Sequence, residues 1–263
     1  ADQHGPVRRT HGGDVRVRRL DRRHRPDKRL SVSDAEPTVS IEIERKYDVD
    51  ESTALPALRD LPGAASLEGP AVRMLDALSF DSAALALAHA HVALRRREGG
   101  PDAGWHIKGP RRPDGGRQEF QWPLGDAPVS SAAVLSTDAA ASPAPVHIPQ
   151  HVAEAIAQWC GDAPMLPLAR LQNTRTVWNV RDARGEVIVE FVDDRVTGSD
   201  LRRGGVRAWR EWEAELGPAA PGDDAGREAL FAALETRVVA AGGRVSASAS
   251  KLGRALGVEG AGE

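Results

Sequence analysis

Two carboxylates and one ammonium group alternate along residues 41–47, Ile-Glu-Ile-Glu-Arg-Lys-Tyr. Successive side chains of a β-strand point to opposite faces, so Glu42, Glu44 and Lys46 would share one face. Two carboxylates on one face repel each other unless a cation lies between them. A divalent metal ion could be that cation, and an exposed edge strand with scattered charges is the simpler alternative. This segment alone leaves both interpretations open.

Later segments that are predicted to be strands repeat this division into one charged and one apolar face. These segments are residues 92–97, 105–108, 118–124, 174–180, 187–192 and 209–216. Basic side chains gather on the charged faces in the middle of the chain, at Lys46, Arg95, Arg97, Lys108, Arg117 and Arg175. Acidic side chains gather at the start and late in the chain, at Glu42, Glu44, Glu190, Glu211 and Glu213. If the sheet turned these faces inward, the lumen could hold a polyanion together with its divalent cation. Faces turned outward would be ordinary solvated hairpins.

Turn sequences rich in Gly, Pro and Asp separate the predicted strands, and a further short strand is predicted at residues 78–80. Helices are predicted at residues 53–61, from the spacing of Val152, Ile156 and Trp159, and at residues 230–238. Strands joined by hairpins with few helices indicate an α+β fold or a closed antiparallel barrel rather than a parallel sheet.

The charge of the chain is unevenly distributed. Of 35 basic and 38 acidic side chains, ten basic but only four acidic ones lie in residues 1–30, which leaves about −9 on the remainder. Such a basic segment is typical of a disordered arm that can touch nucleic acid or polyphosphate. We predict an N-terminal extension at residues 1–38, one domain at 39–257 and a tail at 258–263. Residues 126–149, rich in Ala, Ser and Pro, are predicted to be a poorly ordered connection.

The composition is typical of a cytoplasmic protein with no membrane partner. Cys160 is the only cysteine, so no internal disulfide can form. No apolar run approaches the roughly 20 residues of a membrane span, and no signal peptide is visible. The sequence Gly-x4-Gly-Lys-Ser/Thr does not occur, which excludes P-loop chemistry. His89 and His91 have a strand-like spacing, but no third metal ligand lies nearby in the sequence.

The charged segments resemble motifs of one known family. Residues 42–46, Glu-Ile-Glu-Arg-Lys, resemble the ExExK motif of the CYTH superfamily, also called triphosphate tunnel metalloenzymes. Seven later segments resemble further motifs of this family in the same order, namely Leu78–Ser82, Leu94–Gly100, Trp105–Lys108, Arg117–Glu119, Glu190–Asp194, Glu211–Leu216 and Ser250–Leu252. The resemblance extends from about Val39 to Gly257, and Phe80 and Ser82 replace a commoner Tyr and Thr.

The resemblance implies an α+β fold, an eight-stranded antiparallel β-barrel or tunnel with flanking helices, whose interior binds triphosphate. It implies that Mg²⁺ or Mn²⁺ is held by Glu42, Glu44, Glu190, Glu211 and Glu213. It implies phosphate contacts from Lys46, Arg95, Arg97, Lys108, Arg117, Arg175 and Lys251, with Glu119 orienting these cations. The assignment of the acidic ligands late in the chain stays open, because Asp193, Asp194 or Glu215 could replace or join those named.

Hydrolysis of a terminal phosphoryl group requires charge neutralisation and a water positioned in line. Glu44 and Lys46 are the predicted catalytic residues, with Lys46 either a base for that water or a phosphate clamp, and we favour the clamp. We expect a hydrolase of phosphorus-containing anhydrides, a triphosphatase that acts on inorganic triphosphate, thiamine triphosphate or a nucleotide. A class IV-type adenylyl cyclase and a non-catalytic polyphosphate-binding module are the alternatives. We expect a monomer or a homodimer.

Overall fold

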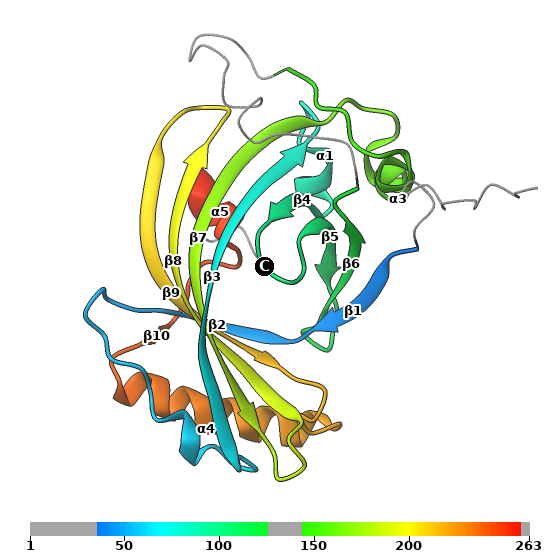
Figure 1. Cartoon of the computed structure of the whole chain (residues 1–263). Helices are drawn as coiled ribbons and strands as arrows, with labels where there is room; N and C mark the ends of the chain where they lie inside the picture. Colours follow the sequence, from blue (N-terminus) through cyan, green and yellow to red (C-terminus); the bar gives the residue numbers. More distant parts are fainter. Residues whose placement is uncertain (1–35, 126–143, 259–263) are drawn as a thin grey trace, which may run out of the picture. The chain divides into compact units, whose positions relative to one another are not determined.

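The computed structural model describes residues 36–125 and 144–258, and within these ranges ten strands form one antiparallel sheet (Figure 1). The strand order is β1-β6-β5-β4-β3-β7-β8-β9-β2-β10. The strands are β1 Thr38–Glu42, β2 Glu44–Asp48, β3 Ser66–Asp81, β4 Ala93–Glu98, β5 Gly104–Arg111, β6 Arg117–Pro123, β7 Leu166–Arg181, β8 Val187–Asp200, β9 Val206–Leu216 and β10 Arg244–Val245. The predicted antiparallel α+β class is confirmed.

The sheet is strongly curved, as expected of a tunnel, but hydrogen bonds between its end strands do not close it (Figure 1). The chain itself joins its two ends, because only Ile43 separates β1 at one edge from β2 near the other edge. Glu42 pairs with Arg117 on β6, and Glu44 pairs with Glu215 on β9. The structure therefore differs from the expected eight-stranded closed barrel in strand number and in the manner of closure.

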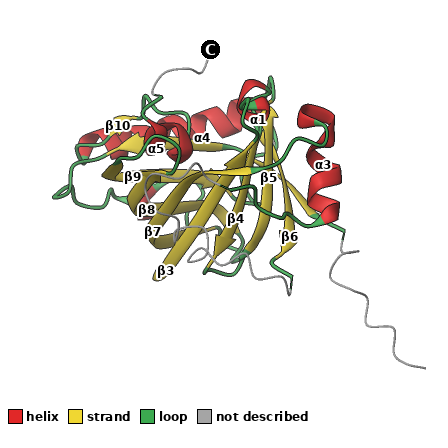
Figure 2. Ribbon diagram, turned by 90° about the horizontal axis from the view of Figure 1, so that it is seen from above, coloured by secondary structure: helices red, strands yellow, loops and turns green. Residues whose placement is uncertain are grey.

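Helices cover the apolar face of the sheet, which we call the outer face, in two places. α4 (Asp224–Ala240) packs over the half that contains Trp212. α1 (Ala86–His89) and α3 (Gln150–Cys160) pack over the half that contains Trp105. In Figure 2, α3 stands beside β6, away from β9. Because the apolar side chains are buried under these helices, the charged face of the sheet is directed inward.

A short helix, α5 (Lys251–Leu256), lies on this opposite, inner face, against β7 and β8. Ser250 caps it, since its side chain accepts a hydrogen bond from a backbone N–H of the first turn at 3.0 Å. Ala255 is fully buried over β8, where a Cβ added at Gly198 would lie only 2.7 Å from the Ala255 side chain. The glycine thus lets α5 approach the sheet closely, and the cap fixes where Lys251 begins the helix.

One local prediction is wrong. Residues 53–61 form no α-helix but only a 3-10 turn, η2 (Leu58–Asp60), and Pro62 disfavours helical geometry in the residue before it. His89 ends the helix α1, and His91 follows in a turn with a φ of +56°, so the two histidines do not share a strand face.

Three predicted segments lie wholly or largely outside the described residues. They are the N-terminal extension, the tail, and the connection at residues 126–149, of which residues 126–143 are not described. β1 begins at Thr38, the last residue that was assigned to the extension. Residues 144–149 of the connection have no helix or strand. Among the helices of the described ranges, none is long and apolar enough to cross a membrane.

Candidate metal and phosphate site

The inner face carries every residue that the sequence predicts for the site. Partners in the strand register point their side chains to the same face, as Arg117 does with Glu42 and Lys46 with Glu213. The residues brought together in this way are Glu42, Glu44, Lys46, Arg95, Arg97, Lys108, Arg117, Glu119, Arg175, Glu190, Glu211 and Glu213, and α5 adds Lys251.

Charged groups from distant strands meet across the inner face. Burial raises the pKa of Glu215 on β9 to about 7, and Lys108 on β5 is the group that most opposes this rise. β5 and β9 are five places apart in the strand order, so only a curved sheet can bring these two side chains near each other. The predicted inward orientation of the charged faces therefore agrees with the structure.

Three buried carboxylates converge on this face. Asp194, Glu211 and Glu213 each offer an oxygen atom, all within 4.8 Å of one another, and the residues are 0, 3 and 7% exposed. Sets of carboxylate oxygens are the ligands that Mg²⁺ and Mn²⁺ prefer, so these residues fit a divalent metal ion. The ammonium nitrogen of Lys251 lies among them, at 2.9, 2.6 and 2.6 Å from their oxygen atoms.

Two further cations complete this carboxylate cluster. Arg175 donates hydrogen bonds to both oxygens of Asp194, at 2.8 and 2.6 Å, and to Glu213 at 2.7 Å. Lys46 of β2 also contacts Glu213. Burial opposes ionisation of Glu213, but Lys251, Lys46 and Arg175 together hold its pKa well below the usual range. Glu213 is therefore ionised, and it is the carboxylate that these three cations share.

Lys46 stays protonated in this arrangement. Burial disfavours its charge, but Glu213 and Glu44 raise its pKa above the usual value, and the Glu44 carboxylate lies 3.0 Å from its ammonium nitrogen. A lysine that acts as a general base needs a lowered pKa. The placement of Lys46 thus favours a phosphate clamp over a base.

Glu119 is the centre of the basic half of the inner face. One of its oxygens accepts a hydrogen bond from Arg95 at 3.0 Å and lies 3.0 Å from Nδ1 of His106. Lys108 pairs with Glu42 on the neighbouring side. Burial raises the pKa of Glu42 to about 8, and a hydrogen bond with Glu119 acts in the same direction. Glu119 thus contacts Arg95 and His106, and the orienting role that the family resemblance implies for it stays a prediction.

Arginines crowd together in this basic half. Burial lowers the pKa of Arg97 to about 9, and nearby Arg95 and Arg175 contribute to the shift. Asp102, in the turn between β4 and β5, pairs with Arg97. Arg117 donates hydrogen bonds to two backbone carbonyls, at 3.0 and 3.1 Å. An anion between these guanidinium groups would offset their repulsion, so the basic half is suited to phosphate.

The carboxylate cluster differs from the ligand set that the resemblance implies. Asp194, which the sequence left open, is one of its three members. Glu190 and Glu44 lie in an adjacent row of the same face, each paired in register with Glu215. Glu42 is turned toward Lys108 instead. The metal-binding roles of Glu42, Glu44 and Glu190 stay predictions.

Arg73 and His106 also lie on the inner face, although the sequence patterns above do not assign them to the site. Arg73 of β3 pairs in register with Arg175, and His106 contacts Glu119. Extending the strand alternation back from residues 78–80 would have placed Arg73 on the charged face. The alternation between the buried Trp105 and Ile107 would have placed His106 there as well.

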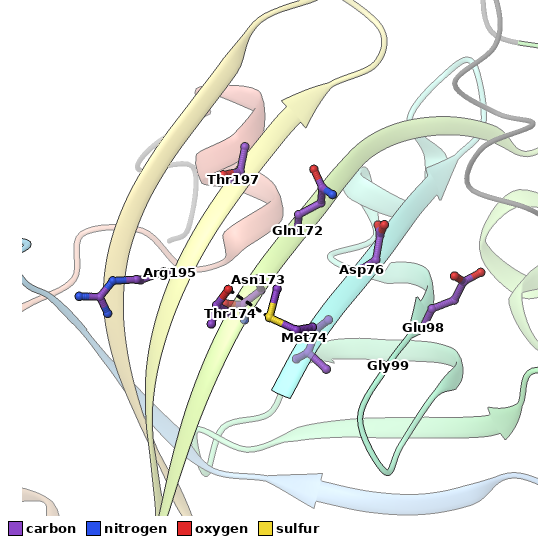
Figure 3. Close-up of a pocket in the computed structure, with 10 residues that line it drawn as sticks. Met74, Asp76, Glu98, Gly99, Gln172, Asn173, Thr174, Arg195 and Thr197 are labelled. Atoms are coloured by element: carbon purple, nitrogen blue, oxygen red, sulfur yellow. Dashed lines mark hydrogen bonds between the residues drawn. The ribbon is translucent and has the colours of Figure 1, made fainter. Parts of the chain in front are cut away.

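A shallow hollow of about 420 Å³ lies elsewhere, on the outer face of β3, β7 and β8 (Figure 3). Thr174 and Arg195 line it, and they alternate along their strands with the inner residues Arg175 and Asp194. The Thr174 hydroxyl lies 3.4 Å from the sulfur of Met74, the dashed contact of Figure 3. The sheet itself separates this hollow from the charged site.

The stability of the metal-free protein is expected to fall as the pH rises from about 4.5 to about 8. Burial raises the pKa of Glu42 from 4.5 to about 8 and that of Glu215 to about 7, so the folded state keeps protons that the unfolded chain releases. Each group then lowers the free energy of unfolding by up to about 1.4 kcal/mol per pH unit. Urea unfolding in EDTA across this range measures the slope.

The variant Glu42→Gln, a neutral mimic, should flatten that slope, whereas Glu186→Gln in the exposed β7–β8 turn should leave it unchanged. Below pH 4.5 the trend reverses, because Glu213 and Asp194 have lowered pKa values and lose their ion pairs when they are protonated. A stability that rises steadily from pH 5 to pH 8 would contradict the assignment.

Comparison with known proteins identifies the family of this chain. The model of the CYTH domain family matches residues 40–239. The chain therefore belongs to the CYTH domain family.

Relatives and solved structures with similar chains are known. Uncharacterized protein Rv2226 of Mycobacterium tuberculosis (strain H37Rv) is 32% identical over 244 residues, which are 89% of this chain and 44% of that protein. Uncharacterized protein MT2285 of strain CDC 1551 has the same identity and coverage. The chain thus spans less than half the length of these relatives. A solved Hippeastrum structure, described as "putative adenylyl cyclase HpAC1" with a dominant triphosphatase activity, is 19% identical. It covers 83% of this chain and 96% of its own, with a TM-score of 0.47.

Proposed function

We propose that this chain is a metal-dependent triphosphatase, which hydrolyses the terminal phosphate of inorganic triphosphate or of an organic triphosphate on the inner face. The observation that carries the proposal is that two sites of opposite charge lie beside each other on the inner face. The cluster of Asp194, Glu211 and Glu213 suits a divalent cation, and crowded arginines beside it suit a polyanion.

The basic half and the carboxylate cluster would have different roles in phosphoryl transfer. Arg95, Arg97 and Lys108 would bind phosphate oxygens and neutralise charge that develops in the transition state. Lys46, held protonated between Glu44 and Glu213, would bind the phosphate that is nearest to the carboxylates. Mg²⁺ or Mn²⁺, held by the carboxylate cluster, would supply further charge neutralisation and activate a water molecule.

A substrate panel tests this function. The full chain is incubated with inorganic triphosphate, thiamine triphosphate or ATP, with Mg²⁺, Mn²⁺ or EDTA, and free phosphate, pyrophosphate and cyclic AMP are measured. We expect metal-dependent release of phosphate from at least one triphosphate and none in EDTA. Cyclic AMP and pyrophosphate formed from ATP would instead identify a cyclase. Binding of triphosphate without any product would leave only the non-catalytic binding module.

A further inference from the structure

His106 occupies a buried position beside Arg95 and Arg97 of β4 and beside Glu119, the centre of the basic half. The residue is 1% exposed and lies on the inner face between Trp105 and Ile107, which are buried on the outer face. Its Nδ1 lies 3.0 Å from the carboxylate of Glu119, and its Nε2 lies 2.9 Å from the backbone carbonyl of Asp102. Each ring nitrogen therefore faces an acceptor oxygen.

These two contacts connect both arginines through one imidazole ring. On one side Glu119 accepts a hydrogen bond from Arg95 at 3.0 Å. On the other side the Asp102 side chain pairs with Arg97, while its carbonyl meets the ring. The contacts thus form one continuous series from Arg95 through Glu119, His106 and Asp102 to Arg97.

The β4–β5 turn that carries Asp102 is contacted at both of its ends. It begins with Gly99 and Gly100, which both have positive φ values, and a Cβ at Gly99 would lie 2.0 Å from the carbonyl oxygen of Met74. Such a backbone is held at its glycine end by close packing on β3, and His106 holds its other end. A shift of the turn would move the carboxylate that pairs with Arg97.

Both ring nitrogens face acceptor oxygens, so the contacts depend on the protonation state of the ring. Arg95 and Arg97 on β4, Glu119 on β6 and Asp102 on the turn are the charged groups that face it. Burial lowers the pKa of His106 to about 4, and the two arginines act in the same direction against Glu119. A neutral ring has one N–H, so one of the two contacts is a donated hydrogen bond at neutral pH.

We propose that His106 is a positioning residue, which holds Arg95 and Arg97 in the geometry that binds phosphate: its one N–H donates to Glu119 or to the Asp102 carbonyl, and the ring keeps the other acceptor at a fixed distance. This inference rests on the proposed function, because it assigns both arginines to a phosphate chain. His106 itself touches no phosphate in this role. It acts through its two neighbours.

Three substitutions separate the two contacts. His106→Asn places an amide near the position of Nδ1 and keeps a partner for Glu119, whereas His106→Gln places its amide near Nε2 and keeps a partner for Asp102. His106→Phe removes both contacts at similar volume. His89→Asn, at an exposed histidine in α1, is the matched control.

The first measurement is the affinity for inorganic triphosphate by calorimetry in EDTA, and the second is phosphate release with Mn²⁺. The Phe variant should bind roughly tenfold more weakly or worse, the loss expected when a hydrogen bond to a charged group is removed. The Asn or the Gln variant should recover part of this loss, according to which nitrogen carries the proton. The increase in KM should exceed the decrease in kcat, and the control should match the unmodified chain.

Equal affinity in the unmodified chain and in folded His106 variants would overturn the proposal. If the Phe variant does not fold, the Asn and Gln variants decide alone. Triphosphate that is bound but not hydrolysed by the unmodified chain refutes the triphosphatase activity, and His106 is then judged by the binding data. Hydrolysis with an affinity that is independent of residue 106 refutes only the role of His106. An unmodified chain that binds no triphosphate refutes both.

Discussion

Replacing Lys251 by methionine is expected to make the folded state dependent on a divalent cation. Its ammonium nitrogen lies within 2.9 Å of oxygens from all three members of the carboxylate cluster. The three members are buried, and Asp194 is wholly inaccessible to solvent. Removing one partner of a buried ion pair leaves uncompensated charge, which costs about 3–5 kcal/mol. In EDTA the melting temperature should therefore fall by roughly 10 °C.

A divalent cation should reverse this loss. Mn²⁺ that binds the folded state at about 100 times its dissociation constant adds about 2.7 kcal/mol to the free energy of unfolding. The variant should also bind Mn²⁺ more tightly than the unmodified chain, because no ammonium group competes for the same oxygens. Thermal unfolding with EDTA and with Mn²⁺, together with calorimetric titration of Mn²⁺, measures both effects.

Arg195→Met provides the control on the same strand. Arg195 is adjacent to Asp194 in sequence but lies on the outer face and is half exposed, so its removal should change neither stability nor metal affinity appreciably. A Lys251→Met variant with an unchanged melting temperature in EDTA would contradict the ion-pair argument. A destabilised variant that Mn²⁺ does not restore would instead contradict the carboxylate cluster as a metal site.

The charged faces of the short strands could be predicted from the sequence because their partners alternate cleanly. Trp105 and Ile107 face one way and Lys108 the other, and the structure keeps this division. The alternation also placed Glu211 and Glu213 together opposite the buried Trp212. In such segments one face is apolar, so the period of two is visible in the residue types alone.

The full lengths of the long strands could not be predicted because both of their faces are polar in places. β8 continues from Val192 through residues 193–200, a run that the apolar pattern does not mark as a strand. Asp193 and Asp194 therefore appeared equivalent in the sequence. The structure separates them, since Asp193 pairs with Arg210 on the outer face and Asp194 pairs with Arg175 on the inner face.

The position of Lys251 could not be deduced from strand patterns at all. It depends on how α5 docks, which is set by the Ser250 cap and by the close approach of Ala255 to Gly198. The resemblance implied a phosphate contact for Lys251, and the structure places it among carboxylates instead. Both roles are compatible if a bound metal ion replaces Lys251 at these carboxylates and the ammonium group then contacts the substrate. The titration with Mn²⁺ tests this exchange.

Glu213→Gln is expected to separate phosphate binding from turnover. Among the described residues, Glu213 is the carboxylate that Lys46, Arg175 and Lys251 all contact. The amide keeps the volume of the side chain but removes the charge that holds a metal ion. Charge stabilisation by a bound metal ion amounts to several kcal/mol in such transition states, so metal-dependent phosphate release should fall at least about a hundredfold.

The same substitution should strengthen the binding of inorganic triphosphate in EDTA, because the inner face loses one negative charge and three cations are released toward the ligand. Glu186→Gln, which removes an exposed carboxylate, should alter neither quantity. Opposite changes in affinity and in turnover cannot result from partial unfolding, since unfolding lowers both. A parallel loss of both in Glu213→Gln would therefore indicate a structural role, and unchanged turnover would exclude Glu213 from the metal site.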